Sequence, residues 1–276
     1  MKPERPNSLN LRKRLFAKSR PSIPEPVIDR ILDYLSEKVL PPFEFALDVG
    51  CGTGLSSAKL APKFNRVLGI DTSVSQIDEA KNAQYLENVD YEVGSAEHLP
   101  CSSDSVDLLM CAQSFHWVDR QKFVPETDRV LKPHGVLALC GYGLVLLEAP
   151  SKSVSDELNT ILTQLHKSVL WDGGYWEKER GIVDSQYADF KLPYEEQKIL
   201  RNDSSLYLRK SMTLDLFMDY LGTWSGLRAY QKQNPEHDII SDYREKFLSA
   251  LGETCSPATM LTVTFPWFLI MCRKAA

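Results

Sequence analysis

The chain has 276 residues, of which 43% are hydrophobic and 25% are charged, a balance that excludes collagen-like, low-complexity and disordered proteins. Its 32 lysines and arginines stand against 37 aspartates and glutamates, which leaves a net charge of -5 at pH 7. Such a chain has no overall attraction to phosphate backbones or anionic lipids, so we expect neither nucleic acid nor a membrane as a partner. The length favours one domain with additional segments around its core.

The cysteines and the N-terminal segment bear on the cellular compartment. The six cysteines include no Cys-x-x-Cys pair, so we expect reduced thiols, with neither a disulfide framework nor a metal site. The first twenty residues carry seven basic side chains but lack the apolar stretch of a secretory signal, and a solvated arm is favoured over a mitochondrial transit peptide. The longest uncharged run, 254–272, is interrupted by Pro257 and Pro266, which argues against a transmembrane span. We therefore expect a cytoplasmic protein.

Between residues 27 and 145, short apolar runs alternate with helical patterns, which predicts a parallel sheet flanked by helices. The five predicted strands are 43–49, 67–70, 89–93, 106–112 and 136–140. Ser73 and Gln76 have the spacing of a capping box, which places the start of a helix after the second strand. The segment 132–135, Lys-Pro-His-Gly, is expected to stop a helix before the fifth strand, and Pro62 and Pro125 shorten or kink their helices.

The alternation ends near residue 150, which predicts a change of architecture. Amphipathic patterns predict helices at 153–170, 214–221 and 239–251, with a strand-like stretch around 195–208. The final apolar run contains Pro266, which suggests an edge or bulged strand that returns to the sheet. The expected organisation of the single domain 1–276 is an N-terminal arm or lid at 1–26, a cofactor-binding core at 27–149, a substrate cap at 150–260 and a return strand at 261–276.

The segment 48–54, Asp-Val-Gly-Cys-Gly-Thr-Gly, lies between the first strand and a helix, where small residues let a ligand approach the backbone. Asp71 ends the second strand, a position from which a carboxylate can bind both ribose hydroxyls. A tight turn and a helix-capping aspartate are the alternative interpretations. The dinucleotide fingerprint needs a glycine at position 55, which is Leu55, so a nicotinamide-dependent oxidoreductase is disfavoured.

These motifs resemble the class I S-adenosylmethionine-dependent methyltransferases, whose first motif is acid-x-Gly-x-Gly-x-Gly. The segment 94–100 is similar to the family's loop around the adenine, and 106–119 is similar to its fourth strand and the turn that faces the methyl group. The resemblance implies S-adenosyl-L-methionine as cofactor and a Rossmann-like, doubly wound, mostly parallel seven-stranded α/β sheet with a mainly helical cap. The cofactor-binding residues it implies are Asp48, Gly50, Gly52, Gly54, Asp71, Ser95, Ala96 and Gln113.

Outer segments are similar to methyltransferases related to trans-aconitate methyltransferase. They include Phe16 with Arg20-Pro21, then Trp176, Arg180 and 223–225 in the same order along the chain. This narrower resemblance implies a small-molecule substrate and O-methylation of a carboxylate. The expected substrate residues are Phe16, Arg20, Trp117, Tyr142, Trp176, Arg180 and Trp224.

Methyl transfer requires mainly positioning, because the sulfonium is already activated. An ionised carboxylate needs no base, and Arg20 or Arg180 could orient it, although either could instead form an ion pair. His116 is the candidate catalytic base for a hydroxyl or amine acceptor, with a packing role as the alternative. The aromatic residues either line a pocket or form core. Carbon, nitrogen or hydroxyl methylation, and a cofactor-binding regulatory protein without activity, stay open, and the sequence fixes neither the acceptor nor the oligomeric state.

Overall fold

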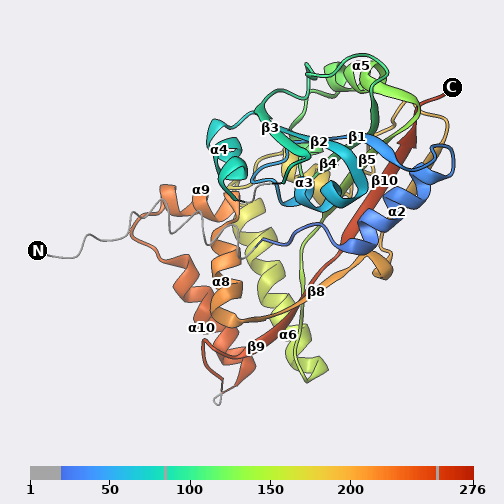
Figure 1. The fold of residues 1–276 in the computed structure, drawn as a ribbon. Helices are drawn as coiled ribbons and strands as arrows, with labels where there is room; N and C mark the ends of the chain where they lie inside the picture. Colours follow the sequence, from blue (N-terminus) through green and yellow to red (C-terminus); the bar gives the residue numbers. More distant parts are fainter. Residues whose placement is uncertain (1–19, 84–85, 253–254) are drawn as a thin grey trace, which may run out of the picture. The chain divides into compact units, whose positions relative to one another are not determined.

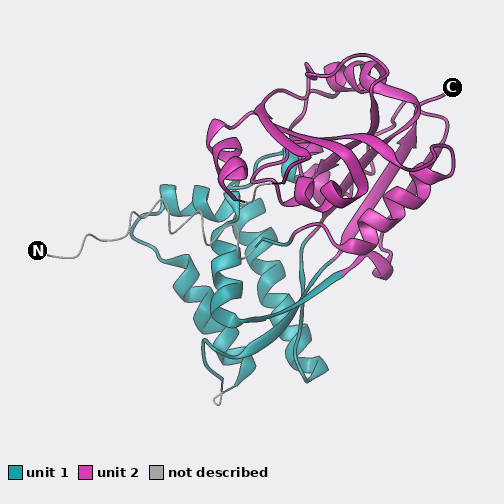
Figure 2. Ribbon diagram, viewed as in Figure 1, with its two compact units in different colours: residues 1–21, 144–180, 208–265 teal, residues 22–143, 181–207, 266–276 magenta. Residues whose placement is uncertain are grey.

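The computed structural model describes residues 20–83, 86–252 and 255–276, and the chain divides into two compact units (Figure 2). Unit 1 comprises residues 1–21, 144–180 and 208–265, and unit 2 comprises residues 22–143, 181–207 and 266–276. The range 150–260, expected as a cap, is thus divided, because 181–207 clusters with the sheet of unit 2. Within the described residues, no helix is both long enough and apolar enough to cross a bilayer.

Unit 2 is built on a sheet of seven strands in the order β3-β2-β1-β4-β5-β10-β7 (Figure 1). The strands are β1 (Phe43–Val49), β2 (Phe64–Asp71), β3 (Val89–Val93), β4 (Val106–Ala112), β5 (Leu131–Tyr142), β7 (Gln197–Leu200) and β10 (Trp267–Arg273). The first five strands in this order are parallel to one another, and β10 is antiparallel to both β5 and β7. All five predicted strands are present, so the predicted mostly parallel sheet is confirmed.

Helices flank this sheet as the alternation of patterns predicted. They are α2 (Glu25–Ser36), α3 (Leu55–Leu60), α4 (Val74–Ala83) and α5 (Arg120–Val130), with α7 (Glu179–Asp184) at the boundary of the two units. Helix α3 is short because Pro62 follows within a 3-10 turn, and α5 accommodates Pro125 in its interior. The carboxylate of Asp119 accepts a hydrogen bond from the Gln121 N–H and so caps the start of α5.

The segment 132–135 lies within β5, not ahead of it as predicted. Helix α5 ends at Val130, and β5 begins directly at Leu131. Leu131 pairs with Val106 and Val136 pairs with Leu108, so the intervening residues form a bulge in the ladder. The sequence pattern marked the interruption correctly, but pairing with β4 holds both sides of the bulge in one strand.

The C-terminal apolar run forms two strands in two different sheets. Strand β9 (Met260–Phe265) belongs to unit 1, and β10 belongs to unit 2, with Pro266 between them. The expectation of an edge strand was wrong, because β10 pairs on both sides and is buried along its whole length. Proline has no N–H to donate, and it stands at the residue where the chain leaves one sheet for the other.

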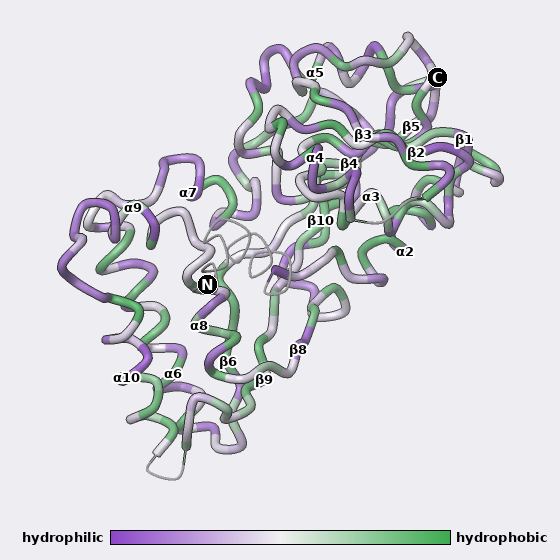
Figure 3. Tube along the Cα trace, turned by 60° about the vertical axis from the view of Figure 1, so that its left-hand side comes forward, coloured by the Kyte–Doolittle hydropathy of each residue, from purple (hydrophilic) through white to green (hydrophobic). Residues whose placement is uncertain are grey.

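Unit 1 combines helices with a sheet of three strands in the order β6-β9-β8. Its elements are β6 (Leu146–Glu148), α6 (Lys152–Gln164), a π-helical turn (Leu165–Trp171), β8 (Leu208–Thr213), α8 (Leu214–Gly222), α9 (Ser225–Gln233), α10 (Ile239–Leu251) and β9. Hydrophobic and hydrophilic residues alternate along α6 and α10, which is the pattern that predicted these helices (Figure 3). Helix α9 was not predicted, since its buried residues are only Gly226 and Leu227.

Candidate functional site

The predicted cofactor residues of unit 2 gather at one edge of its sheet. They follow β1, β2, β3 and β4, which are neighbours in the order β3-β2-β1-β4 and run parallel. The carboxyl ends of parallel neighbours lie at the same edge, and this is where open α/β sheets bind ligands. The sheet topology therefore brings the glycine loop, Asp71, Ser95 and Gln113 to one place.

All three glycines of the loop after β1 have positive φ, at 70° for Gly50, 56° for Gly52 and 81° for Gly54. A side chain at Gly50 would lie 2.4 Å from the Ser114 Cβ, and one at Gly54 would lie 2.4 Å from the Tyr91 hydroxyl oxygen. At Gly52, apart from its two chain neighbours, the one described atom within 4 Å of a Cβ would be the Gln76 Oε1, at 3.9 Å. The protein itself thus requires glycine at positions 50 and 54, whereas position 52 leaves an open cradle that a bound cofactor fits.

Asp71 is half-buried and holds the loop through its carboxylate. Its Oδ2 accepts from the Gly52 N–H at 3.0 Å, and its Oδ1 accepts from the Ser73 N–H at 2.9 Å. Each oxygen keeps capacity for a second donor, because an ionised carboxylate offers about four acceptor positions. The geometry fits the ribose role predicted for Asp71 and adds a structural one, since the same group fixes the backbone of the loop.

Asp48 lies behind the loop and is fully buried. The Ser57 hydroxyl donates to its Oδ2 at 2.6 Å, and its Oδ1 has no hydrogen-bond partner among the described residues. Burial raises the pKa of this carboxyl to about 7, the Ser57 hydrogen bond opposes the shift, and the Asp71 charge adds to it.

The other predicted cofactor residues lie in the loops after β3 and β4. The Ser95 hydroxyl donates to the Glu97 carboxylate, and Ala96 is buried. Gln113 has a positive φ of 58°, and its side-chain amide donates to the Tyr142 carbonyl at 2.9 Å. These polar side chains are therefore engaged in shaping their loops, and a direct contact with the cofactor stays a prediction for each.

Four large apolar side chains are exposed at the same edge, and sequence reasoning identified only Trp117 among them. Leu55 begins α3, Val74 begins α4, and Val93 ends β3. Their exposed fractions are 39%, 61% and 53%, and that of Trp117 is 57%. Apolar groups at a ligand-binding edge suit a flat aromatic base such as adenine. The sequence contained a signal for the other three, because each is the first or last residue of a helix or strand beside a polar loop.

His116 lies on the 3-10 turn Phe115–Trp117 that follows β4. Its Nδ1 is 3.3 Å from the hydroxyl of Tyr187, which is fully buried in the core of unit 2. Because a buried side chain is held by packing, this contact orients the imidazole. Tyr142, predicted to contact substrate, is 3% exposed, and its ring centroid is 5.3 Å from that of Trp267. The catalytic role of His116 and the substrate role of Tyr142 stay predictions.

Four predicted substrate residues come together in unit 1 although they are far apart in the sequence. Trp176 and Trp224 have ring centroids 5.6 Å apart, Arg180 lies over the ring of Trp176 at 5.3 Å, and Arg20 lies over the ring of Tyr220 at 5.8 Å. Tyr220 contacts Trp224 in turn, with centroids 5.9 Å apart. We refer to Trp176, Tyr220, Trp224 and the adjoining His166 as the aromatic cluster of unit 1. Phe16 lies outside the described residues.

The tryptophans of the aromatic cluster are held firmly. A Cβ at Gly226 would lie 2.8 Å from the indole of Trp176, so this ring lies directly on the backbone at the start of α9. The indole N–H of Trp176 donates to the His166 carbonyl at 3.2 Å, and Trp224 is 4% exposed. Both rings therefore contribute to the core of unit 1, in addition to any contact with substrate.

Two arginines converge on Thr223, the residue that follows α8. Arg20 donates from Nε to the Thr223 hydroxyl at 3.0 Å and from Nη2 to the Thr223 carbonyl at 3.2 Å. The Nη2 of Arg228 donates to the same carbonyl. The contacts fit the preference of cations for helix C-termini, and they place two guanidinium groups beside each other. Sequence reasoning missed Arg228, which lies three residues beyond the segment 223–225.

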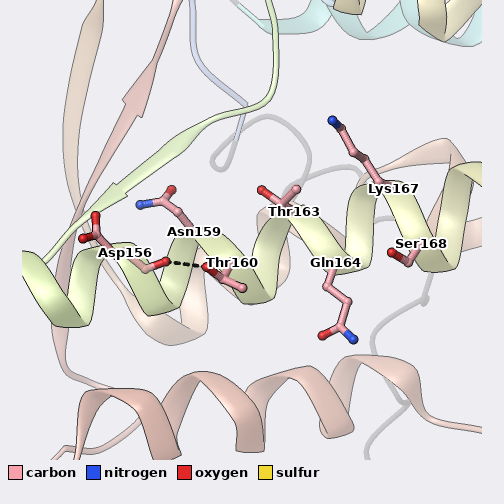
Figure 4. A pocket seen from close by; sticks show the side chains of 7 residues that line it. All are labelled: Asp156, Asn159, Thr160, Thr163, Gln164, Lys167 and Ser168. Carbon is pink, nitrogen blue, oxygen red and sulfur yellow. Dashed lines mark hydrogen bonds between the residues drawn. The ribbon is translucent and has the colours of Figure 1, made fainter.

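An open groove of about 570 Å³ follows the polar side of α6 and the π-helical turn (Figure 4). It is lined by Asp156, Asn159, Thr160, Thr163, Gln164, Lys167 and Ser168. Most of these side chains are exposed, and the Asn159 amide already bonds to the backbone of Leu147. The groove contains none of the predicted site residues and is a solvated helix face.

The known proteins to which this chain is similar are named as methyltransferases. A family model described as a methyltransferase domain matches residues 47–139. A Dictyostelium discoideum protein named as a methyltransferase is 30% identical over 231 residues, which cover 84% of this chain and 82% of that protein. The probable S-adenosylmethionine-dependent methyltransferase CRG1 of Saccharomyces cerevisiae is 23% identical over 280 residues, or 92% of this chain and 93% of CRG1.

A solved structure from Anaeromyxobacter dehalogenans, described as a type II methyltransferase, has a TM-score of 0.73 at 30% sequence identity and covers 93% of this chain and 99% of that one. The sheet order of unit 2 and this likeness together establish the Rossmann-like methyltransferase fold. The open cradle at Gly52 and the remaining acceptor capacity of Asp71 fit the cofactor of that fold. The chain belongs to the class I S-adenosylmethionine-dependent methyltransferases, enzymes for which S-adenosylmethionine is the methyl donor.

Proposed function

We propose that this enzyme methylates a carboxylate oxygen of a small molecule, as the trans-aconitate methyltransferase-like group does. The observation that carries the proposal is the placement of Arg20 in unit 1. Its guanidinium adjoins that of Arg228 at Thr223, next to Tyr220 of the aromatic cluster. Two neighbouring guanidinium groups beside aromatic rings favour an anion with an organic body, because the planar fork matches a carboxylate with two hydrogen bonds.

In the proposed reaction, S-adenosylmethionine supplies a methyl group on a positively charged sulfur. A carboxylate oxygen donates an electron pair to the methyl carbon while the carbon–sulfur bond breaks, which yields a methyl ester and a neutral thioether. The glycine loop and Asp71 of unit 2 are the proposed cofactor-binding groups, and the Arg20 guanidinium of unit 1 is the proposed carboxylate-binding group. The acceptor is already ionised at neutral pH, so no residue has to remove a proton. Positioning and exclusion of water then supply the rate enhancement.

A hydroxyl acceptor is the second candidate, and the contact between His116 and Tyr187 favours it. A hydroxyl must lose its proton as the new bond forms, and an imidazole oriented by a buried tyrosine suits a general base. The two candidates differ in their products, because alkaline hydrolysis releases methanol from a methyl ester but leaves a methyl ether intact.

The test is a screen of carboxylic acids, trans-aconitate included, with methyl-labelled S-adenosylmethionine and detection of labelled products by mass spectrometry. For an acid that is methylated, Arg20→Lys and Arg228→Lys should each lower kcat/KM by more than about tenfold while S-adenosylhomocysteine binding stays unchanged. Arg244→Lys is the matched control, since Arg244 pairs with Asp215 on the outside of unit 1.

A best substrate without an acidic group would contradict the carboxylate proposal. Wild-type kcat/KM in both the Arg20→Lys and the Arg228→Lys variants would contradict it as well. The hydroxyl alternative would then be tested. Its methyl ether product should resist alkaline hydrolysis, and His116→Asn should lower the rate at which it forms.

A further inference from the structure

The connection between α9 and α10 of unit 1 brings three titratable side chains into hydrogen-bond contact (Figure 1). Tyr230 lies in the last turn of α9, His237 in the connecting loop, and Asp242 in the first turn of α10. The Tyr230 hydroxyl oxygen is 2.7 Å from His237 Nδ1, and His237 Nε2 is 2.6 Å from Asp242 Oδ2. We refer to these three residues as the Tyr-His-Asp triad. None of them belongs to the predicted cofactor or substrate residues.

The backbone of the loop holds His237 between the two helices. The His237 N–H donates to the Asn234 carbonyl at 3.1 Å, and the His237 carbonyl accepts from the Ile239 N–H at 3.1 Å. Asp238 caps α10, because its carboxylate accepts from the Ser241 N–H at 3.2 Å. The chain is therefore fixed on both sides of His237, which places the imidazole between its partners from α9 and α10.

The carboxylate of Asp242 determines which nitrogen of the imidazole carries the proton. An ionised carboxylate can only accept, and the first turn of a helix favours its negative charge, so His237 Nε2–H donates to Asp242. In a neutral imidazole the other nitrogen is an acceptor, so the Tyr230 hydroxyl donates to Nδ1. A hydroxyl, a base within hydrogen-bond reach and a third group that orients the base are the parts of an activated nucleophile.

A neighbouring tyrosine has the opposite kind of hydrogen bond. The rings of Tyr175 and Tyr230 have centroids 4.8 Å apart, and both residues are half-buried. The Tyr175 hydroxyl accepts from the side-chain amide of Asn234 at 3.2 Å, and an amide donor cannot take up a proton. The side chains of His237 and Asp242 are 48% and 54% exposed, so small molecules in solution can reach the triad. Tyr175 is therefore an internal reference for the reactivity of Tyr230.

We propose that Tyr230 is a nucleophile activated by His237, and that its hydroxyl is a site of modification by activated acyl groups such as thioesters or acyl imidazoles. The Tyr230 oxygen attacks the acyl carbon, the bond from that carbon to the leaving group breaks, and the hydroxyl proton passes to His237 Nδ1. The imidazolium then gives this proton to the leaving group. Asp242 stabilises the imidazolium in between, and the products are an ester of Tyr230 and the protonated leaving group.

The test measures the acetylation of individual tyrosines by N-acetylimidazole, with the full chain digested after the reaction and the peptides quantified by mass spectrometry. In the wild type, Tyr230 should react at least about tenfold faster than Tyr175, because a positioned general base accelerates proton transfer. His237→Gln replaces the base by an amide and should slow Tyr230 at least about tenfold without changing Tyr175. Glu245→Gln is the matched control, since Glu245 is an exposed acid on the next turn of α10 and should leave both rates unchanged.

A double variant separates base catalysis from a structural effect. Asp242→Asn should slow the acetylation of Tyr230 about three- to tenfold in the wild type but not in the His237→Gln background, because Asp242 acts through the imidazole. Equal rates for Tyr230 and Tyr175 in the wild type would overturn the proposal. It would also fail if His237→Gln left the Tyr230 rate unchanged, or if this variant changed both tyrosines by the same factor, as expected when the histidine only holds the loop in place.

Discussion

Asp48, near the end of β1, and Asp71, at the end of β2, differ in burial and in the donors that surround their carboxyl groups. Asp71 is half-buried, and two backbone N–H groups stabilise its charge. Asp48 is fully buried with a single donor, Ser57, and burial raises its pKa to about 7 from an ordinary value of 3.8. The protein thus presents one carboxylate at the cradle and keeps a second, whose pKa burial raises, behind the loop.

This difference predicts a pH-dependent stability. The unfolded chain loses the Asp48 proton near pH 4, whereas the folded chain keeps it until about pH 7. The stability that the protonated Asp48 contributes is therefore lost as the pH rises through this window, by up to about 4 kcal/mol. Asp48→Asn removes the titration, so its stability relative to the wild type should rise steadily from pH 4 to pH 7.

Urea unfolding at pH 4, 5, 6 and 7 measures the effect without bound ligand. Asp78→Asn, at an exposed position on α4, serves as the control and should follow the wild type. If the free energies of unfolding of Asp48→Asn and the wild type differ by the same amount at every pH, Asp48 ionises in the folded protein at its ordinary pKa.

At the scale of elements, the connection from β1 to α3 combines packing with ligand access. Gly50 and Gly54 are required by Ser114 and Tyr91, which occupy the places where their side chains would lie. Gly52 shares the positive φ of the other two, at 56°, but has free space where its side chain would lie. One loop therefore holds two glycines that packing requires and one whose predicted role is cofactor binding.

Alanine substitutions should separate these roles. Gly54→Ala should destabilise the ligand-free protein by about 1 to 3 kcal/mol or more, through strain at positive φ together with the clash against Tyr91. Gly52→Ala carries only the backbone strain, about 1 to 2 kcal/mol, but should bind S-adenosylhomocysteine at least tenfold more weakly, and Gly52→Val should abolish binding. Urea unfolding and calorimetry measure the two effects. Wild-type affinity in a folded Gly52→Val variant would refute the cradle.

The sequence located the elements of the sheet better than their ends. The strands at 43–49, 89–93 and 106–112 were predicted with their observed bounds. Mostly apolar runs report burial in the first and third of these strands, whereas 89–93 alternates apolar and charged residues and is largely exposed. Strands β2 and β5 extend further than predicted, since ladder pairing recruits Arg66 into β2 and holds Leu131 in β5 beyond the bulge that contains Lys132. Local patterns record burial, whereas strand ends are set by the partner strand.

At the scale of the whole molecule, cofactor binding should be visible as stability. A ligand that binds only the folded protein stabilises it by about 2.7 kcal/mol at 100 times its Kd. We expect S-adenosylhomocysteine to raise the midpoint of thermal unfolding and NAD to leave it unchanged, because Leu55 replaces the third glycine of the dinucleotide fingerprint. Differential scanning fluorimetry with both ligands measures this, and a shift with NAD alone would contradict the assignment of the cradle.

The sequence by itself determined the cofactor platform of this protein. The glycine loop, Asp71 and the strand runs are local signals, because a tight turn, a strand end and a buried strand each depend on a few consecutive residues. Only the tertiary structure decided which distant residues meet. Arg20 and Arg228 share Thr223, β9 and β10 separate at Pro266, and Gln76 loses its capping partner to Asp71. These outcomes depend on packing between segments far apart along the chain, and no local pattern encodes them.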